Sequence, residues 1–184
     1  MALNRVGKHC KAIFGNKEGE QMIQVSDYVD VRKRAQELDC NMPESITLLP
    51  RNFENARSKN ELVYETTTPT VRTLWRQNDI TENALEKPED RFPLVIEDSF
   101  EWIGPIIFVS SSIISQNPHS ITVALNVISN YLTGWFKGIP RRDREAKLSI
   151  VVETKDMSYR KMEYEGPPEG LKDLPPVIKE MGNE

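Results

Sequence analysis

A glutamate and a lysine two positions apart end a strand-like segment in the carboxyl-terminal half of the chain. In SIVVETK, Glu153 and Lys155 follow the apolar residues 150–152. This has the local form of half of a restriction-type nuclease site, in which the acid holds a metal ion and the lysine orients water. An upstream acid is also needed, and Asp98 and Asp143 are the candidates. A metal-dependent hydrolase or nuclease is therefore one hypothesis, although Glu-x-Lys also arises by chance in a charged chain.

Two further groups of polar residues lie next to apolar segments. Glu97, Asp98 and Glu101 follow the segment FPLVI, a common place for groups that bind Mg²⁺ or transfer protons, although acids there are often simply solvated. Serines precede a predicted helix start at Pro118, where free N–H groups and the helix dipole attract anions. The loop lacks the glycines of phosphate-binding loops, so capping of local turns is the alternative. The serines are Ser110, Ser111, Ser112 and Ser115.

Histidine and cysteine are scarce. The chain holds two of each: His9, His119, Cys10 and Cys40. A four-ligand zinc site would need all four, and their spacing matches no zinc module. We therefore expect no metal and no cofactor, and we infer free thiols in a reducing, cytoplasmic setting.

The composition is that of one soluble domain. The 184 residues suffice for a core without disulfides, charged residues make up 28% and the net charge is −4. Because a dedicated nucleic-acid binder usually carries a basic excess, nucleic acid is not an expected partner. Residues 1–24 contain no apolar leader and are interpreted as a polar arm, followed by a single domain over 25–184.

The stretch from Trp102 to Phe136 contains no Asp, Glu, Lys or Arg. A membrane-spanning helix needs about 20 mostly apolar residues, and here serines, Asn117 and Pro118 interrupt the run at what would be mid-bilayer depth. The pattern instead predicts a buried strand over 105–110 and a helix that begins at Pro118. Apolar residues then recur every three or four positions as far as Phe136.

The remaining elements follow from periodicity and turn residues. Pro175 and Pro176 are expected to break the last helix. The expected elements are a helix from Ser26 to about 40, strands over 45–50, 61–67 and 92–98, a helix from Pro69 capped by Thr68, a short helical turn and then a loop within 81–91, a hairpin of 148–154 with 159–165, and a helix in part of 171–181. The fold class is α+β, a mixed sheet whose carboxyl-terminal hairpin packs on one central apolar helix; the alternative is a three-layer α/β fold.

The helix after Pro118 is apolar on more than one side. Val123 and Val127 lie off its main stripe, Trp135 and Phe136 end it, and Trp102 begins the charge-free stretch. Aromatic residues at the rim of a core often anchor contacts with a partner. The leading hypothesis is a non-enzymatic protein–protein interaction module, or a subunit of a multi-component assembly, that binds a protein partner or itself.

Overall fold

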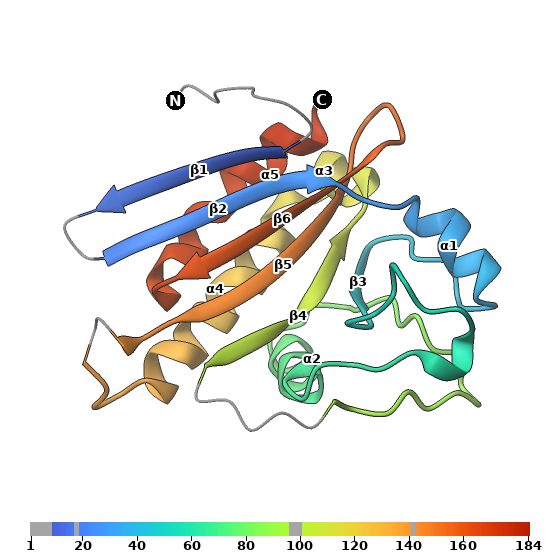
Figure 1. Ribbon diagram of the computed structural model, residues 1–184, viewed down its shortest axis with the longest axis horizontal. Coiled ribbons are helices and arrows are strands. Elements are labelled where there is room, and N and C mark those ends of the chain that lie inside the picture. Colours follow the sequence, from blue (N-terminus) through green and yellow to red (C-terminus); the bar gives the residue numbers. More distant parts are fainter. Residues whose placement is uncertain (1–8, 17–18, 96–100, 141–142) are drawn as a thin grey trace.

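The computed structural model describes residues 9–16, 19–95, 101–140 and 143–184, with backbone only for residues 9–16, 19 and 20. These residues form one mixed β-sheet with helices, in the strand order β1-β2-β6-β5-β4-β3 (Figure 1). The α+β prediction with a mixed sheet is therefore confirmed. No helix in the described part of the chain is long and apolar enough to cross a membrane.

Neighbouring strands are antiparallel except for β4 and β5, which are parallel. A parallel pair needs a crossover connection, and here α3 and α4 provide it. β5 and β6 form the predicted antiparallel hairpin, in which Glu153 pairs with Tyr159 next to the turn. The strands are β1 (His9–Asn16), β2 (Gly19–Asp27), β3 (Ile46–Leu49), β4 (Trp102–Val109), β5 (Ala146–Glu153) and β6 (Tyr159–Gly166).

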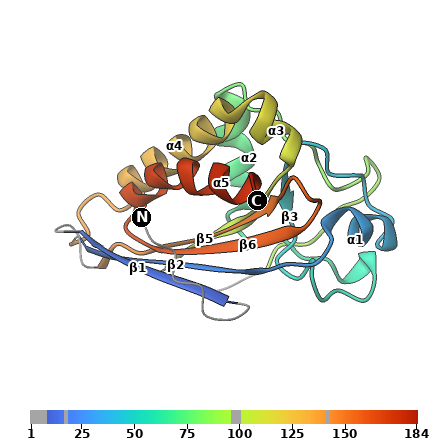
Figure 2. The same cartoon turned by 90° about the horizontal axis from the view of Figure 1, so that it is seen from above.

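Four of the α-helices lie on one side of the sheet, and α1 lies beside its other face (Figure 2). The α-helices are α1 (Val31–Glu37), α2 (Thr68–Gln77), α3 (Ser111–Gln116), α4 (Pro118–Trp135) and α5 (Leu174–Gly182), and the short 3₁₀ helices are η1 (Lys59–Glu61) and η3 (Pro168–Asp173). Trp75 of α2 donates its indole N–H to the Ala124 carbonyl of α4 over 3.3 Å. This bond fixes the two helices side by side.

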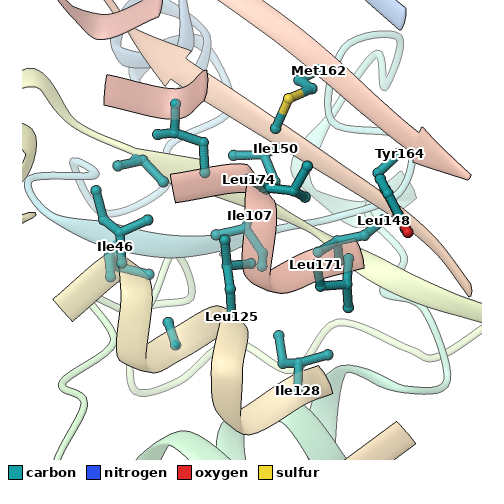
Figure 3. Close-up of a cluster of buried hydrophobic side chains, with 14 of the residues drawn as sticks. Ile46, Ile107, Leu125, Ile128, Leu148, Ile150, Met162, Tyr164, Leu171 and Leu174 are labelled. Carbon is teal, nitrogen blue, oxygen red and sulfur yellow. The ribbon is translucent and has the colours of Figure 1, made fainter. Parts of the chain in front are cut away.

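The larger core lies between the sheet and this layer of helices. Figure 3 shows Leu125 and Ile128 of α4 together with Ile107, Leu148 and Ile150 from the central strands. The packing is close, because a Cβ atom added to Gly104 would lie 2.6 Å from Cδ1 of Leu148. Apolar burial of this kind stabilises by roughly 25 cal/mol per Å².

A second core lies on the other face of the sheet, beneath α1. Ile106 and Phe108 of β4 point into it, whereas their neighbours Ile107 and Val109 point into the first core. The end of β4 is therefore covered on both faces. A strand buried on both faces reads as a continuous apolar run, which explains why PIIFV carries no charge.

The structure differs from the sequence interpretation near the amino terminus. The predicted arm contains β1 and most of β2, and β2 pairs with β6 in the sheet. Residues 1–8 lie outside the described residues. The predicted helix from Ser26 begins instead at Val31, capped by Asp30, whose carboxylate accepts the Lys33 N–H over 3.0 Å. Residues 26 and 27 are taken up by the pairing with β6.

Further local differences concern proline and isolated strands. Pro175 and Pro176 lie in the first turn of α5, where a missing N–H costs nothing, so they begin a helix rather than break one. The expected strands over 61–67 and 92–98 reduce to a bridge between Tyr64 and Leu94, with 96–98 outside the described residues, and 81–91 contains no helix. The short helix α3 was not expected. The start of α4 at Pro118 was predicted correctly.

Candidate functional site

Glu153 is a fully buried carboxylate that joins four elements. It accepts bonds from Arg32 of α1 (Nε to Oε1, 2.6 Å; Nη2 to Oε2, 3.2 Å). It also accepts the N–H and hydroxyl of Ser111, at 3.0 and 3.1 Å, and the hydroxyl of Tyr159 at 3.2 Å. Five donors therefore converge on one carboxylate, which leaves little capacity for a metal ion.

The charge state of Glu153 follows from these contacts. Burial raises the pKa of the Glu153 carboxyl, but the hydrogen bonds from Arg32 and the Ser111 N–H, with the positive charge of Arg32, lower the pKa below its usual value. The group is thus a carboxylate at neutral pH. Its arrangement is that of a structural ion pair between α1 and the end of β5.

Among the described hydrolase candidates, Asp143 lies far from Glu153. Lys155 is exposed in the β5–β6 turn, and Asp143 precedes β5 at the end opposite to Glu153. An eight-residue strand spans roughly 25 Å, so Asp143 and Glu153 cannot share an ion. Glu97 and Asp98 lie outside the described residues, and a role for Asp98 stays a prediction. Among the residues described, no cluster of three or more His, Cys, Asp or Glu side chains is placed to hold a metal.

The four serines make bonds within the chain. Ser110 caps α3 and donates its hydroxyl to the Glu44 carbonyl at 2.9 Å, and Ser112 donates to the same carbonyl at 3.1 Å. Ser115 bonds back to the Ser111 carbonyl. The anion that meets the N–H of Ser111 is Glu153 of the same chain. The sequence placed these donors before a helix start at Pro118, whereas the structure places Ser110 and Ser111 at the start of α3, where an internal carboxylate accepts from Ser111.

The predicted interaction residues divide into two groups. Trp102 and Phe136 are buried in the larger core, and Val123 and Val127 are half-buried on α4, with Val123 packed against that core. Trp135 differs, because 46% of it is exposed. It is thus the predicted interaction residue that offers a large apolar surface to solvent.

Trp135 lines a hollow of about 190 Å³ at the junction of three elements, which we call the α2–α4 hollow. The start of α2, the start of β4 and the end of α4 form its walls. Its lining residues are Glu65, Thr66, Thr67, Thr70, Glu101, Trp102, Ile103, Tyr131 and Trp135. Tyr131 precedes Trp135 by one helical turn, a spacing visible in the sequence. The residues from α2 become neighbours only through the packing of α2 on α4.

The side chain of Trp135, which forms the aromatic wall of the hollow, packs against a buried aromatic ring. The ring of Trp135 contacts the buried ring of Phe136 edge to face, with centroids 4.7 Å apart and planes at 85°. Such pairs contribute about 0.5–1.5 kcal/mol beyond the area they bury. The exposed indole is therefore preorganised, and little side-chain freedom is left to lose when a ligand packs on it.

The opposite wall of the hollow is polar, and two of its hydrogen-bond donors have partners within the chain. Thr67 donates its hydroxyl to the Ile103 carbonyl at 2.7 Å, and the Thr68 N–H donates to the Glu65 carbonyl at 3.0 Å. Pro69 has no N–H. The Glu65 carboxylate is largely buried and lies 3.5 Å from Nε of Arg51.

Glu101, which lines the hollow, is also part of an ion-pair cluster centred on Lys147 of β5. Lys147 lies 2.9 Å from Glu101, 3.5 Å from Glu145 and 3.8 Å from Glu165, so one ammonium faces three carboxylates. Burial and hydrogen bonding to Glu165 raise the pKa of the Glu145 carboxyl.

Two other candidate regions have internal explanations. A hollow of about 210 Å³ on the uncovered face of the sheet is lined mainly by polar side chains of β2, β5 and β6, as expected of a solvated sheet face. Arg72 of α2 bonds Glu82 at 2.9 Å and Glu86 at 2.8 Å, and its guanidinium lies 4.8 Å from the Tyr64 ring centroid. This cluster fastens residues 82–86 to α2.

Comparison with known proteins yields no likeness to reason from: no family model, no curated protein and no solved structure matches the chain. The functional inference therefore depends on the geometry of the α2–α4 hollow.

Proposed function

We propose that the protein is a non-enzymatic binding module that holds another protein at the α2–α4 hollow. The observation that carries this proposal is Trp135, a tryptophan nearly half exposed beside a hollow and fixed by the buried ring of Phe136. Tryptophan is enriched among the residues that contribute most to protein interfaces.

The size of the hollow favours a side chain over a substrate. At about 190 Å³ it is smaller than the roughly 300–1,000 Å³ of typical small-molecule sites. A single large side chain of a partner fits such a volume. The buried Glu153, which sequence reasoning offered as a catalytic group, already accepts five hydrogen bonds.

The test compares two exposed apolar residues in the same chain. Trp135→Ala removes the proposed anchor, and Met157→Ala is the matched control, because Met157 is 57% exposed in the distant β5–β6 turn. Proteins captured from cells of the source organism by the wild type and both variants are quantified by mass spectrometry. We expect a partner whose recovery falls at least tenfold with Trp135→Ala and is unchanged with Met157→Ala, since truncating an interface anchor costs about 2 kcal/mol or more.

Sedimentation velocity of the wild type separates a foreign partner from self-association. Self-association that Trp135→Ala abolishes would identify a second copy as the occupant and would retain the binding site. Recovery of all captured proteins at equal levels by wild type and Trp135→Ala, with a monomer throughout, would overturn the proposal.

A further inference from the structure

The outer edge of the sheet at β1 is a second candidate binding surface. We propose that β1 pairs antiparallel with β1 of a second copy of this chain, so that one sheet continues across a symmetric dimer. This surface is separate from the α2–α4 hollow, because β2, β6 and β5 lie between β1 and β4, which lines that hollow.

β1 is the outermost strand of the sheet (Figure 1). It pairs with β2 along its whole length, from His9 to Asn16, and in the described part of the chain no strand pairs with its other side. Its backbone N–H and C=O groups that point away from β2 therefore form a row that another extended strand can bind.

The opposite edge of the sheet is covered by the chain itself. β3 has only four residues, and all of them are buried. The Ile46 carbonyl accepts the N–H of Asn83 at 2.8 Å, and the Leu48 carbonyl accepts the hydroxyl of Tyr64 at 3.4 Å. Short length and coverage by loops are two ways in which proteins protect a sheet edge from pairing.

The sequence and register of β1 lack most of the features that protect an edge strand. It has eight residues, twice the length of β3, and its register with β2 is continuous. It contains no proline, and Lys11 is its one charged residue. Proteins usually guard long edges with several charges, proline or a bulge. β1 is therefore better suited to pairing with another strand than to remaining an edge.

The two faces of the sheet restrict how two copies can pair. A two-fold axis perpendicular to the sheet keeps each face on the same side in both copies, so even-numbered residues of β1 lie opposite even-numbered ones. With Ala12 on the axis, Ala12 lies opposite itself and Cys10 lies opposite Phe14 of the second copy. These positions continue the rows of the larger core, since Ala12 pairs with Ile23 and Cys10 with Val25.

The same pairing also suits the charge of the strand. Lys11 lies opposite Ile13 of the second copy, twice by symmetry, so the two lysines are not directly opposite each other. An axis at Ile13 would instead place Cys10 opposite Asn16, an apolar residue against a polar one. Because cross-strand pairs of like polarity stabilise a sheet, the axis at Ala12 is preferred.

Substitutions at Ile13 test the pairing through charge. Sedimentation velocity over a concentration series gives the dissociation constant of the dimer for wild type, Ile13→Lys and Ile13→Glu. We expect a reversible wild-type dimer. Ile13→Lys should dissociate at least about fivefold more readily than Ile13→Glu, because the new lysine repels Lys11 of the second copy and the glutamate attracts it. High salt should reduce this difference.

The matched controls are Met157→Lys and Met157→Glu in the exposed β5–β6 turn, which add the same charges away from β1. Their dissociation constants should not differ from each other.

Single-cysteine variants locate the symmetry axis, and they keep the proposal testable if a substitution at Ile13 prevents folding. In a chain with Cys10→Ser and Cys40→Ser, Ala12→Cys should form an intermolecular disulfide under mild oxidation. Opposite Cα atoms of antiparallel strands lie about 4.5–5.5 Å apart, within the range of a disulfide. Met157→Cys in the same background is the control and should stay unlinked.

A monomer at every concentration would overturn the proposal. A dimer that Ile13→Lys and Ile13→Glu affect alike, or that fails to link through Ala12→Cys, would overturn the pairing of β1 with itself. A dimer abolished by Trp135→Ala would place the contact at the α2–α4 hollow and would likewise overturn it. The capture experiment decides the proposed function separately.

Discussion

Replacement of Glu153 by glutamine tests whether its carboxylate is a structural ion pair. The change keeps the shape of the side chain but removes its charge and turns one accepting oxygen into an NH₂ donor. That donor then faces the donors of Arg32, Ser111 and Tyr159, which now bond the carboxylate. We expect the variant to fold and to be less stable than the wild type.

The expected loss of stability depends on the burial of Glu153 and on the exposure of its partner Arg32. Breaking a buried ion pair by removing one partner costs about 3–5 kcal/mol. Glu153 is fully buried, but the Arg32 side chain is 30% exposed, so water can solvate the guanidinium after the change. A net hydrogen bond to a charged group contributes about 1.5–3 kcal/mol. We therefore expect a loss of about 2–3 kcal/mol in the free energy of unfolding at pH 7.

The assay is urea unfolding of wild type and Glu153→Gln from pH 7 to pH 3. The folded-state pKa of Glu153 is lowered, so the unfolded chain takes up a proton first as the pH falls. The stabilisation by Glu153 is therefore fully present above the unfolded pKa of about 4.3 and is lost as the pH falls through the folded pKa. The difference in unfolding free energy between the two proteins should shrink below about pH 4.5.

Glu163→Gln is the control, because the Glu163 side chain is 47% exposed on the uncovered sheet face and should cost less than about 0.5 kcal/mol. A double-mutant cycle with Arg32→Met should give a coupling energy above about 1 kcal/mol. A loss below 0.5 kcal/mol for Glu153→Gln, or a difference that does not change with pH, would refute the structural role.

Two further substitutions test the packing described above. Gly104→Ala should cost about 1–3 kcal/mol in thermal or urea unfolding, because its Cβ atom would lie 2.6 Å from Leu148; a neutral effect would show that the strands can separate locally. Arg72→Met should cost about 3 kcal/mol or more by urea unfolding, since it leaves Glu82 and Glu86 mostly buried without their cation; a cost under 1 kcal/mol would mean that these carboxylates are solvated or protonated instead.

Local sequence signals correctly predicted elements whose start or periodicity can be read from neighbouring residues. Asn117 and Pro118 mark the start of α4, and alternation marks the β5–β6 hairpin. The start of α1 was misplaced because Ser26 and Asp27 are good helix caps, but their backbone pairs with β6, more than a hundred residues away. Such long-range pairing overrides local propensity and leaves no trace in a short window.

The candidate site was predictable only in part. Trp135 was predicted as an interaction residue because an aromatic residue ends an apolar helix, and it is exposed. Phe136, which also ends that helix, and Trp102, which begins the charge-free stretch, were predicted with it yet are buried, because periodicity does not show which aromatic side chains the fold covers. Glu65 and Thr67 carried no signal, because they reach the hollow only through the packing of α2. The burial of Glu153 carried no local signal either, because the second core beneath α1, which contains Val151 and Tyr159, is formed by segments distant in the chain.

The pairing of β2 with β6 also has a consequence for the order in which the chain folds. The β1–β2 hairpin is synthesised before the other described strands, but β2 pairs with β6, which is made after all of them, so Asp27 can pair with Arg160 only late in synthesis. Contacts between distant parts of a chain slow folding, because a long loop must close before they form. During synthesis on the ribosome the β1–β2 hairpin therefore remains without its sheet neighbour until β6, more than a hundred residues further along the chain, has emerged.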